Sequence, residues 1–497
     1  MLTPLQSYLE KTPPQSVEPA LVAYIANLQQ TAAIMPRIAG AIVKELESQR
    51  SHLKLIASEN YCSYAVQSAM GNLLTDKYAE GYPGFRYYGG CENIDAVETA
   101  AAEEAKTLFG ADHAYLQPHS GADANLVAYW AILSAKVEGP ILANLGESNL
   151  SNLPETPWED LRKSLGNQKL LGLDYYSGGH LTHGYRQNVS ARMFRSYSYG
   201  VDRKTHLLDY EAIEKQAMEV KPLILLAGYS AYPRTVNFRR FREIADKCGA
   251  VLMVDMAHFA GLVAGKAFTG DEDPVQWADI VTTTTHKTLR GPRGAMILCK
   301  KEYADFVNKG CPLVLGGPLG HVMAAKAVAL REAGSEEYRQ YARKIQENAR
   351  ALAAECVRLG LQVQTGGTDN HLLLLNIAES HGITGRQGET ALFECGITLN
   401  RNSLPFDQNG PWWTSGLRIG VPAVTTLGMG EPEMREIAGI VKFVLDNAKA
   451  PAESKKGPIR LTESTIKAAR KRVQALLTAF PLYPELDLPF LKAQFLP

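Results

Sequence analysis

Two short segments in the middle of this 497-residue chain place an acid, two imidazoles and an amine after buried strands. The first, VLMVDMAH, is an apolar strand that ends in Asp255, and His258 follows three residues later. The second, DIVTTTTHKTLRGPRG, reaches His286 and Lys287 and continues into a glycine-containing loop. Because ligands of open α/β sheets bind beyond the carboxyl ends of the strands, these side chains should share one crevice.

The chemistry that this set predicts centres on the amine of Lys287. Burial disfavours the charged form of a lysine, which lowers its pKa and leaves a nucleophilic amine. A nucleophilic lysine with a carboxylate partner suits pyridoxal phosphate: the lysine forms a Schiff base, and Asp255 keeps the pyridine nitrogen protonated so that the ring acts as an electron sink. A metal site on Asp255 and His258, or ordinary polar residues at strand ends, are the alternatives.

A helix start in the segment LQPHSGADANLVAYWAIL is the predicted phosphate site. Ser120 is a good N-cap residue, and Gly121 allows the backbone to approach a ligand closely. The first turn of a helix also has free N–H groups that bind phosphate. An ordinary helix cap is the alternative interpretation.

The segment YAEGYPGFRYYGG, residues 78–90, crowds tyrosines and glycines around one carboxylate. Glu80 is the only acidic residue between Asp76 and Glu92, which makes it a candidate proton carrier. A tyrosine-rich dimer interface accounts for the same composition, and both interpretations can hold together.

The segment TSGLRIG, residues 414–420, places Arg418 inside an expected strand. A mostly buried arginine needs an acidic partner, and the carboxylate of a substrate fits its planar, two-pronged donor set. An internal aspartate or glutamate would satisfy the arginine equally well.

The elements that must position these residues alternate between strands and helices. We expect buried strands at 141–145, 223–227, 251–255 and 280–285, and helices at 96–109, 122–133 and 239–248. Such alternation predicts an α/β fold with a doubly wound, mostly parallel sheet.

We expect four parts along the chain. They are a helical N-terminal arm (1–60), a large cofactor-binding domain (61–330), a small C-terminal α+β domain (331–450), and a linker beginning PAESKKGP with one basic helix (451–497). Within the small domain we expect a long helix at 331–356, strands at 371–377 and 416–421, and a helix at 432–447. Residues 131–177 have weak periodicity and polar interruptions, so we expect an inserted surface excursion there.

Composition disfavours several other classes of protein. Lysine plus arginine and aspartate plus glutamate both number 52, and the resulting zero net charge argues against a protein built around nucleic acid but leaves room for a local basic patch. We expect no membrane span, because no apolar run approaches the ~18–20 residues that one needs, and the N-terminus lacks a signal-peptide pattern. The seven scattered cysteines form no CxxC pair, which argues against a disulfide scaffold or a zinc site. We therefore expect a cytoplasmic protein without metal, nucleic-acid or membrane partners.

Taken together, these segments resemble the serine hydroxymethyltransferase family of fold-type I pyridoxal-phosphate enzymes. The matching motifs, in the family's order and spanning about 55–420, are LIASENY, YAEGYPG-x-RYYGG, QPHSG, GGHLTHG, SAY, VDMAH-x-AGLVA, TTTTHKTL-x-GPRG, GGPL-x-H, GGTDNH and TSG-x-R-x-G. The resemblance implies glycine hydroxymethyltransferase activity: serine and glycine are interconverted while tetrahydrofolate, as co-substrate, carries the one-carbon unit. It also implies a homodimer with shared active sites.

The resemblance further implies roles for residues at the motif positions. Catalytic roles fall to Lys287 as the Schiff-base lysine, Asp255, His258, His286 and the acid/base Glu80. Cofactor contacts fall to Tyr78, Ser120, Gly121, His180, Ser230, Asp255, His258, Lys287 and Arg293, with Gly316 and Gly317 supplied by the neighbouring subunit. Contacts to amino acid and folate fall to Ser58, Glu80, Tyr87, Tyr88, Gly179, Leu181, Asn402, Trp412 and Arg418.

The sequence departs from the family pattern at 122–123, 131–177 and 311–315, all expected near folate or phosphate rather than near Lys287. A folate-independent aldolase or an alanine racemase, as the main or a side activity, is therefore the alternative. A relative that only binds the cofactor is disfavoured, because binding alone does not require Lys287, Asp255, Arg418 and Glu80 together.

Overall fold

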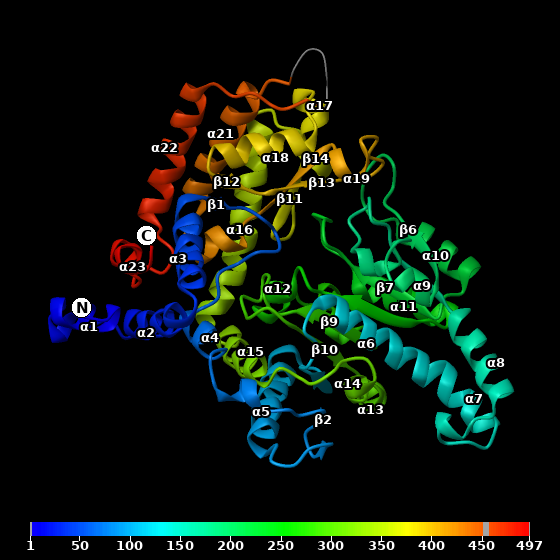
Figure 1. The fold of residues 1–497 in the computed structure, drawn as a ribbon. Helices are drawn as coiled ribbons and strands as arrows, with labels where there is room; N and C mark the ends of the chain where they lie inside the picture. The colour runs from blue at the N-terminus through cyan, green and yellow to red at the C-terminus, as the bar shows by residue number, and fades with distance from the viewer. Residues whose placement is uncertain (1, 451–456, 497) are drawn as a thin grey trace.

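A seven-stranded sheet forms the centre of the larger half of the molecule in the computed structural model, which describes residues 2–450 and 457–496 (Figure 1). In spatial order its strands are β4 (His113–Tyr115), β10 (Ala295–Cys299), β9 (Ile280–Thr284), β8 (Val251–Asp255), β7 (Ile224–Gly228), β5 (Lys169–Leu173) and β6 (Arg195–Tyr199). Strand β10 runs antiparallel to both of its neighbours, and the remaining pairs are parallel. The predicted mixed, mostly parallel sheet is confirmed.

Both faces of this sheet are buried, and every residue of the central strands β7, β8 and β9 is buried. Ile224 and Leu226 of β7 point into a core cluster with α6 (Gly121–Leu133). Leu225 and Ala227 point into the opposite cluster, which holds α5 (Glu92–Phe109), α10 (Tyr210–Val220) and α11 (Phe238–Cys248). The sheet is thus doubly wound, and the parallel register sets the carboxyl ends of β7, β8 and β9 side by side.

The smaller half of the molecule is built on a three-stranded antiparallel sheet, shown in the upper part of Figure 1. Its strands, in order, are β11 (Leu372–Asn376), β14 (Gly416–Gly420) and β13 (Asn400–Asn402). Its helices are α16 (Glu336–Arg358), α17 (Ile377–His381), α18 (Gly385–Glu394), α19 (Gly410–Trp413), α20 (Pro422–Thr426) and α21 (Glu431–Asn447). The predicted strands and the helix at 432–447 agree with these elements to within one or two residues.

The two ends of the chain pack against each other. Helices α1 (Pro4–Lys11), α2 (Pro19–Ile34) and α3 (Pro36–Ser51) share an apolar cluster with the C-terminal helix α23 (Leu488–Phe495) (Figure 1). After α3, the short strand β1 (Leu53–Lys54) pairs in parallel with β12 (Ile397–Thr398). Helix α22 (Glu463–Ala479) is the predicted basic helix, whereas α23 was not predicted. Residues 451–456 of the predicted linker lie outside the described residues.

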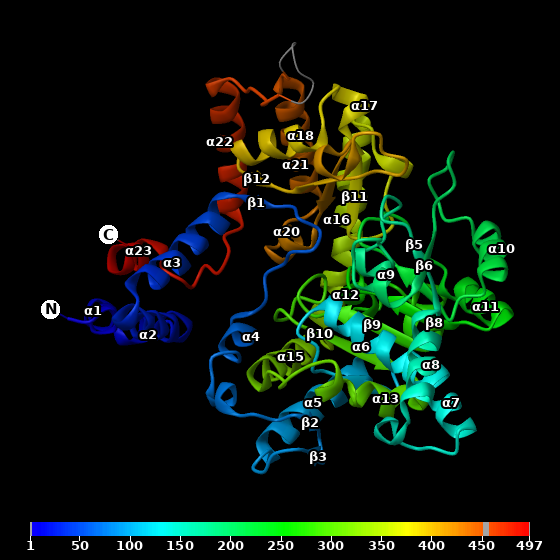
Figure 2. The ribbon, with the colours of Figure 1, turned by 45° about the vertical axis from the view of Figure 1, so that its right-hand side comes forward.

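Shorter elements connect these parts. They are α4 (Tyr64–Ser68), the hairpin of β2 (Gly81–Tyr82) and β3 (Phe85–Arg86), α9 (Ser190–Met193), α12 (Ala260–Ala264), α13 (Ala304–Asn308), α14 (Gly310–Leu313) and α15 (Gly320–Ala333). The hairpin lies next to α5, away from the small sheet (Figure 2). The domain boundaries at 60, 330 and 450 stay a prediction.

Two predictions between 131 and 177 are wrong. Residues 141–145 are not a strand, because α6 continues through a π-helical turn at Ser134–Glu138 into α7 (Gly139–Asn144). Residues 169–173 form the buried strand β5 inside the large sheet, so the predicted surface excursion does not include them. Between them lies α8 (Glu155–Gly166). Short apolar runs fit both a helix and a strand, and periodicity alone did not separate them.

The helix predicted at 331–356 is also divided. Helix α15 ends at Ala333, and α16 begins at Glu336. Ser335 caps the second helix by accepting a hydrogen bond from the backbone N–H of Tyr338 at 3.1 Å.

One helix in the described part of the chain, Gly121–Asn144, is long and apolar enough to cross a membrane, with a mean hydropathy of 1.3. The sequence-based statement that no such run exists is therefore wrong. Half of the apolar stretch is buried inside the protein, and α6 packs on the large sheet. A core helix passes the same length and composition test, so this single helix is weak evidence for a membrane span.

Candidate active site

Asp255, the last residue of β8, is a buried carboxylate surrounded by donors. Its Oδ2 accepts hydrogen bonds from Asn125 Nδ2 at 2.9 Å and His183 Nε2 at 3.2 Å, and its Oδ1 accepts from the Ala257 N–H at 3.0 Å. Burial by itself raises the pKa of this carboxyl, but the hydrogen bond and charge of His183, with His180 and Lys287, hold it well below its usual range. The site therefore keeps a permanent negative charge at the end of β8.

Lys287 follows the neighbouring strand β9. Burial lowers the pKa of its amine to about 8, the attraction of Asp255 opposes this, and the positive charges of Arg418 and Arg293 lower it further. The Lys287 carbonyl accepts a hydrogen bond from Asn60 Nδ2 at 3.0 Å, which holds the backbone of this turn. The predicted meeting of Asp255 and Lys287 at adjacent strand ends is thus borne out by the topology.

Two histidines beside Lys287 are held neutral. Burial lowers the pKa of His180 to about 4, and its Nδ1 bonds the Thr182 hydroxyl at 2.8 Å. Burial also lowers the pKa of His286 to about 3, with further lowering by Arg293 and Lys287. Arg293 itself is exposed.

Arg418 comes from β14 and reaches across to the large sheet. Its Nη1 donates to the Ser230 carbonyl after β7 at 2.7 Å, and its Nε donates to Asn400 Oδ1 at 3.1 Å. Burial lowers its pKa to about 10, so the side chain stays cationic. Within residues 2–450 and 457–496 no acidic side chain forms an ion pair with Arg418, so the internal-partner alternative is not realised there.

A cleft of about 430 Å³ opens in front of Arg418, between the two halves of the molecule. Its lining comes from both halves and comprises Tyr175, Gly179, His180, Leu181, Ser230, Ala231, Glu389, Asn400, Arg401, Asn402, Ser403, Pro411, Thr414 and Arg418. Of the substrate residues predicted by resemblance, Gly179, Leu181 and Asn402 lie here. Trp412 instead borders a neighbouring hollow, where its ring lies 4.4 Å from the guanidinium of Arg386. Ser58 follows Ala57, which lies against Gly420 of the strand that carries Arg418.

The start of α6 matches the predicted phosphate site in its local geometry. Ser120 is the N-cap, and its hydroxyl accepts from the Asp123 N–H at 3.2 Å. A Cβ on Gly121 would lie 2.9 Å from the methyl group of Thr284, so a larger residue here would require the Thr284 side chain to shift.

A second group of predicted residues lies on the surface near the β2–β3 hairpin. The Tyr78 hydroxyl donates to Glu80 Oε1 at 3.2 Å, and the Tyr78 ring packs edge-on against Tyr88 with centroids 5.0 Å apart. Gly317 lies against the Tyr78 ring, and Gly316 precedes it. Tyr78, Tyr87 and Tyr88 are 53, 71 and 47% exposed. No hydrogen bond or ion pair between described residues joins this group to Lys287, Asp255 or Arg418.

Several side chains that organise the site were not singled out from the sequence. Asn125 links Asp255 to the Thr282 hydroxyl of β9, donating to the first and accepting from the second at 2.6 Å. His371 contacts His258, with Nε2 and Nδ1 3.1 Å apart. The motifs QPHSGADAN and GGTDNH contain both residues, so a search for polar residues in otherwise apolar segments would have flagged them.

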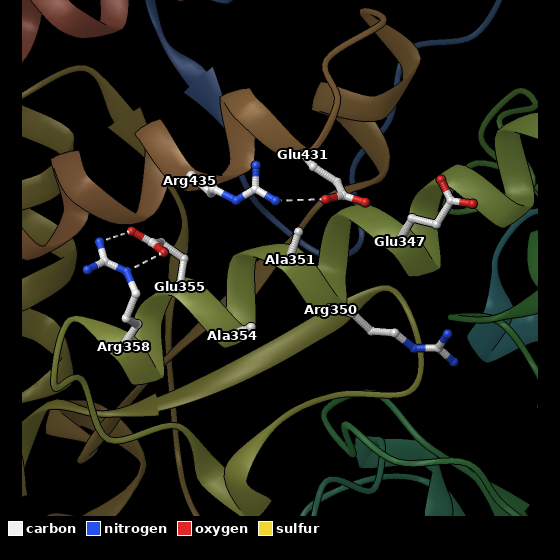
Figure 3. Close-up of a pocket in the computed structure, with 8 residues that line it drawn as sticks. All are labelled: Glu347, Arg350, Ala351, Ala354, Glu355, Arg358, Glu431 and Arg435. Atoms are coloured by element: carbon white, nitrogen blue, oxygen red, sulfur yellow. Dashed lines mark hydrogen bonds and ion pairs between the residues drawn. The ribbon is translucent and has the colours of Figure 1, made fainter.

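Another hollow, of about 490 Å³, lies on the outside of the small domain between α16 and α21 (Figure 3). Charged pairs line it, including Glu355 with Arg358 and Glu431 with Arg435. None of the predicted site residues borders it, so it is a poor candidate for the reaction.

Comparisons with known proteins agree with the motifs. The model of the family described as serine hydroxymethyltransferase matches residues 32–145 and 164–441, leaving out 146–163 around α8. A protein of Treponema pallidum named serine hydroxymethyltransferase is 64% identical over 99% of this chain and 86% of its own length. Proteins of the same name from Mycolicibacterium smegmatis and Chlamydia trachomatis are 56 and 53% identical, each over 94% of this chain and 95% of their own length. The predicted resemblance is confirmed: the chain belongs to the serine hydroxymethyltransferase family.

Proposed function

We propose that this chain reversibly transfers a one-carbon unit from serine to tetrahydrofolate, giving glycine and 5,10-methylenetetrahydrofolate, with pyridoxal phosphate attached at Lys287. One observation carries the proposal. At the ends of two adjacent parallel strands, an amine whose pKa is lowered to about 8 faces a carboxylate that is held ionised. A lysine that is readily neutral acts as a nucleophile, and a fixed anion stabilises a protonated ring nitrogen.

The surrounding residues fit pyridoxal phosphate. Asp255 would hold the ring nitrogen, the uncharged imidazole of His180 would stack on the ring, and Ser120 with Gly121 at the start of α6 would hold the phosphate. His258, Ser230 and Arg293 would complete the set, and the neutral His286 lies next to the lysine. When bound, this cofactor supplies a sink for the electron pair released at the substrate Cα.

Arg418 would bind the carboxylate of serine or glycine. It is cationic, it faces the cleft, and its Nη1 and Nε are anchored to Ser230 and Asn400. An anchored guanidinium orients a carboxylate, and so decides which bond at Cα lies perpendicular to the ring and breaks.

The folate ring would lie in the outer part of the cleft. Leu181, Asn402 and Pro411 offer both apolar surface and hydrogen-bonding groups, which is the combination that a flat heterocycle needs. Tyr175 and Gly179 close the inner end beside His180.

Glu80, Tyr78, Tyr87, Tyr88, Gly316 and Gly317 would act on the site of a second copy in a homodimer. Exposed apolar side chains surround them in one chain, including Leu73 at 85%, Phe85 at 67% and Leu313 at 62%. Exposed apolar patches of this kind are typical of interaction surfaces, and the fixed Tyr78–Glu80 hydrogen bond presents a carboxylate on that surface. Each copy would then complete its partner's site.

The test is the absorbance spectrum of purified protein with pyridoxal phosphate, titrated with glycine in the presence and absence of tetrahydrofolate. A shared amino-acid and folate site predicts a strong new long-wavelength band only when both are present. A response to glycine that ignores tetrahydrofolate would instead favour a folate-independent aldolase or alanine racemase. Failure to bind pyridoxal phosphate would overturn the proposal.

A further inference from the structure

A pair of buried imidazoles interacts electrostatically with Lys287 and Arg418, and one of its nitrogens is buried without a hydrogen-bond partner among the described residues. His371, just before β11, is 0% exposed, and its Nε2 lies 3.1 Å from Nδ1 of His258. The rings are tilted by 34° with centroids 5.4 Å apart. The second nitrogen of His371, Nδ1, is buried without any hydrogen-bond partner among the described residues.

Both imidazoles are neutral. Burial lowers the pKa of His371 to about 3, and burial likewise holds the pKa of His258 far below its usual value. The charged groups that act on the pair are Lys287 and Arg418, and both disfavour a further positive charge. A neutral imidazole carries a single N–H. In the hydrogen bond between the two rings, one histidine therefore donates its N–H, and the other accepts it with its unprotonated nitrogen.

The orphaned Nδ1 of His371 distinguishes the two arrangements. If His258 donated, the proton of His371 would sit on Nδ1, leaving a buried N–H without an acceptor. If His371 donates from Nε2, its Nδ1 is only an unused lone pair. Buried donors without an acceptor are rarer in native proteins than acceptors without a donor, so the second arrangement is favoured.

We propose that His371 is a positioning residue that donates its Nε2–H to Nδ1 of His258 and thereby fixes His258 as the tautomer protonated on Nε2. His258 Nε2 has no hydrogen-bond partner among the described residues, so in this tautomer it carries an N–H that is free to donate. Which ring nitrogen of a histidine carries the proton is set by the bond that the other nitrogen makes. His258 would then donate to an oxygen of a bound molecule, a step that rests on the proposed function.

The tautomer is measured in ligand-free protein by nitrogen NMR with ¹⁵N-labelled histidine, with a His258→Asn variant to assign the signals of His258. We expect a bare Nδ1 and a protonated Nε2 on His258. The His371→Leu variant should lose this preference and show a mixture, whereas His371→Gln should keep it because its amide N–H can still donate. A protonated Nδ1 in the unmodified protein, or an unchanged tautomer in His371→Leu, would overturn the proposal.

Turnover provides a second readout. His371→Leu should lower kcat/KM on the order of 10- to 100-fold, the range produced by the loss of one buried hydrogen bond, and His371→Gln should recover most of it. The control is His113→Leu, which removes a hydrogen bond of 2.8 Å to Asn308 at the edge strand β4, outside the cleft. Equal losses in His371→Gln and His371→Leu would argue for a purely structural role. Because the NMR result needs no cofactor, a failure of the proposed function would not be mistaken for a failure of this inference.

Discussion

The residues around Lys287 and those around Glu80 come from equally distinctive sequence motifs, yet they differ in the folded chain. Around Lys287, the described contacts leave little freedom: Asp255 has three donors, and Arg418 has two anchors. Around Glu80, the hydrogen bond of its carboxylate is to the Tyr78 hydroxyl, and the neighbouring tyrosines are 47 to 71% exposed.

The Lys287 region is held in place by contacts within one chain, whereas the Glu80 region exposes side chains that a second chain could contact. The Lys287 region is preorganised within one chain, so under the proposed function cofactor binding would depend mainly on residues of that chain. Arg86 holds the backbone of the Glu80 region in place. It donates hydrogen bonds to the carbonyls of Ala79 and Gly81 and forms an ion pair with buried Glu98. A rigid backbone beneath an exposed, tyrosine-rich surface is suited to contact with a second copy of the chain.

The most severe disruption should come from Lys287→Ala. Removing the amine removes the attachment point of the cofactor, and we expect turnover to fall at least about 10,000-fold. Steady-state kinetics and the loss of the visible absorbance band measure this effect.

A second buried lysine provides the control for Lys287. Lys326 on α15 donates to the carbonyls of Leu116 and Ala295, and burial lowers its pKa to about 7. Lys326→Met should lower the free energy of unfolding by on the order of 3 kcal/mol but still permit covalent attachment of pyridoxal phosphate. Substantial turnover in Lys287→Ala would refute the assignment of the reactive amine.

The next largest effect is expected for Glu80→Gln. The loss of a proton carrier should slow the tetrahydrofolate-dependent reaction by about 100- to 10,000-fold while glycine still binds. The measurement is a glycine titration followed by a rate assay on the same preparation.

Mixing variants tests whether the two regions meet across a dimer. Co-expression of Lys287→Ala with Glu80→Gln chains should yield hybrid dimers in which one of the two sites is intact, or about one quarter of all sites if the chains pair at random. No recovery above the single variants would mean that Glu80 does not act on a partner's site.

Arg418→Ala should have a smaller effect, a loss on the order of 2–4 kcal/mol in kcat/KM for serine. The expected reason is the loss of the carboxylate contact, since no acidic residue of the described chain pairs with Arg418. Arg401→Ala is the matched control, because Arg401 also lines the cleft but is already paired with Glu389. A loss no greater than that of Arg401→Ala would point to a structural arginine.

The mildest test uses pH alone. The amine of Lys287 has its pKa lowered to about 8, so the neutral, reactive form becomes populated as the pH rises through 8. The rate at which pyridoxal phosphate attaches to the apo protein should rise about tenfold between pH 7 and pH 9 and then level off. A rate that continues to rise toward pH 10.5 would show that the pKa of Lys287 is that of an ordinary lysine. The contrast between a preorganised Lys287 region and an exposed Glu80 region would then be weaker.

The sequence was informative where a local pattern has one structural solution. The strands ending at Asp255 and Thr284 begin with apolar residues and are buried along their whole length, as strands covered on both faces of a parallel sheet are. Ser120 was predicted as an N-cap from its type and position, and the structure has it there. The prediction was wrong at 141–145, where a short apolar run continues a helix rather than forming a strand. It also missed β5, because polar residues on both sides of this strand made the segment look like a surface loop.

The partners of the catalytic groups could not be predicted in the same way. Asp255 is bonded by Asn125 and His183, and His258 by His371, residues that lie 130, 72 and 113 positions away in the chain. Nothing in the local spacing of these residues shows that they meet. Their contacts depend on how α6, the loop after β5 and the small sheet pack on the ends of β8 and β9.

The sequence by itself determined the family through its motifs and the fold class through its strand and helix periodicity, and it predicted Lys287, Asp255 and Arg418 as the reactive lysine, acid and arginine. Only the tertiary structure decided which predicted residues share one cleft, which protonation states they hold, and which stand apart on the surface. The physical reason is that burial and long-range hydrogen bonds set the pKa of Lys287 and the charge of Asp255. Neither property exists until distant segments have packed together.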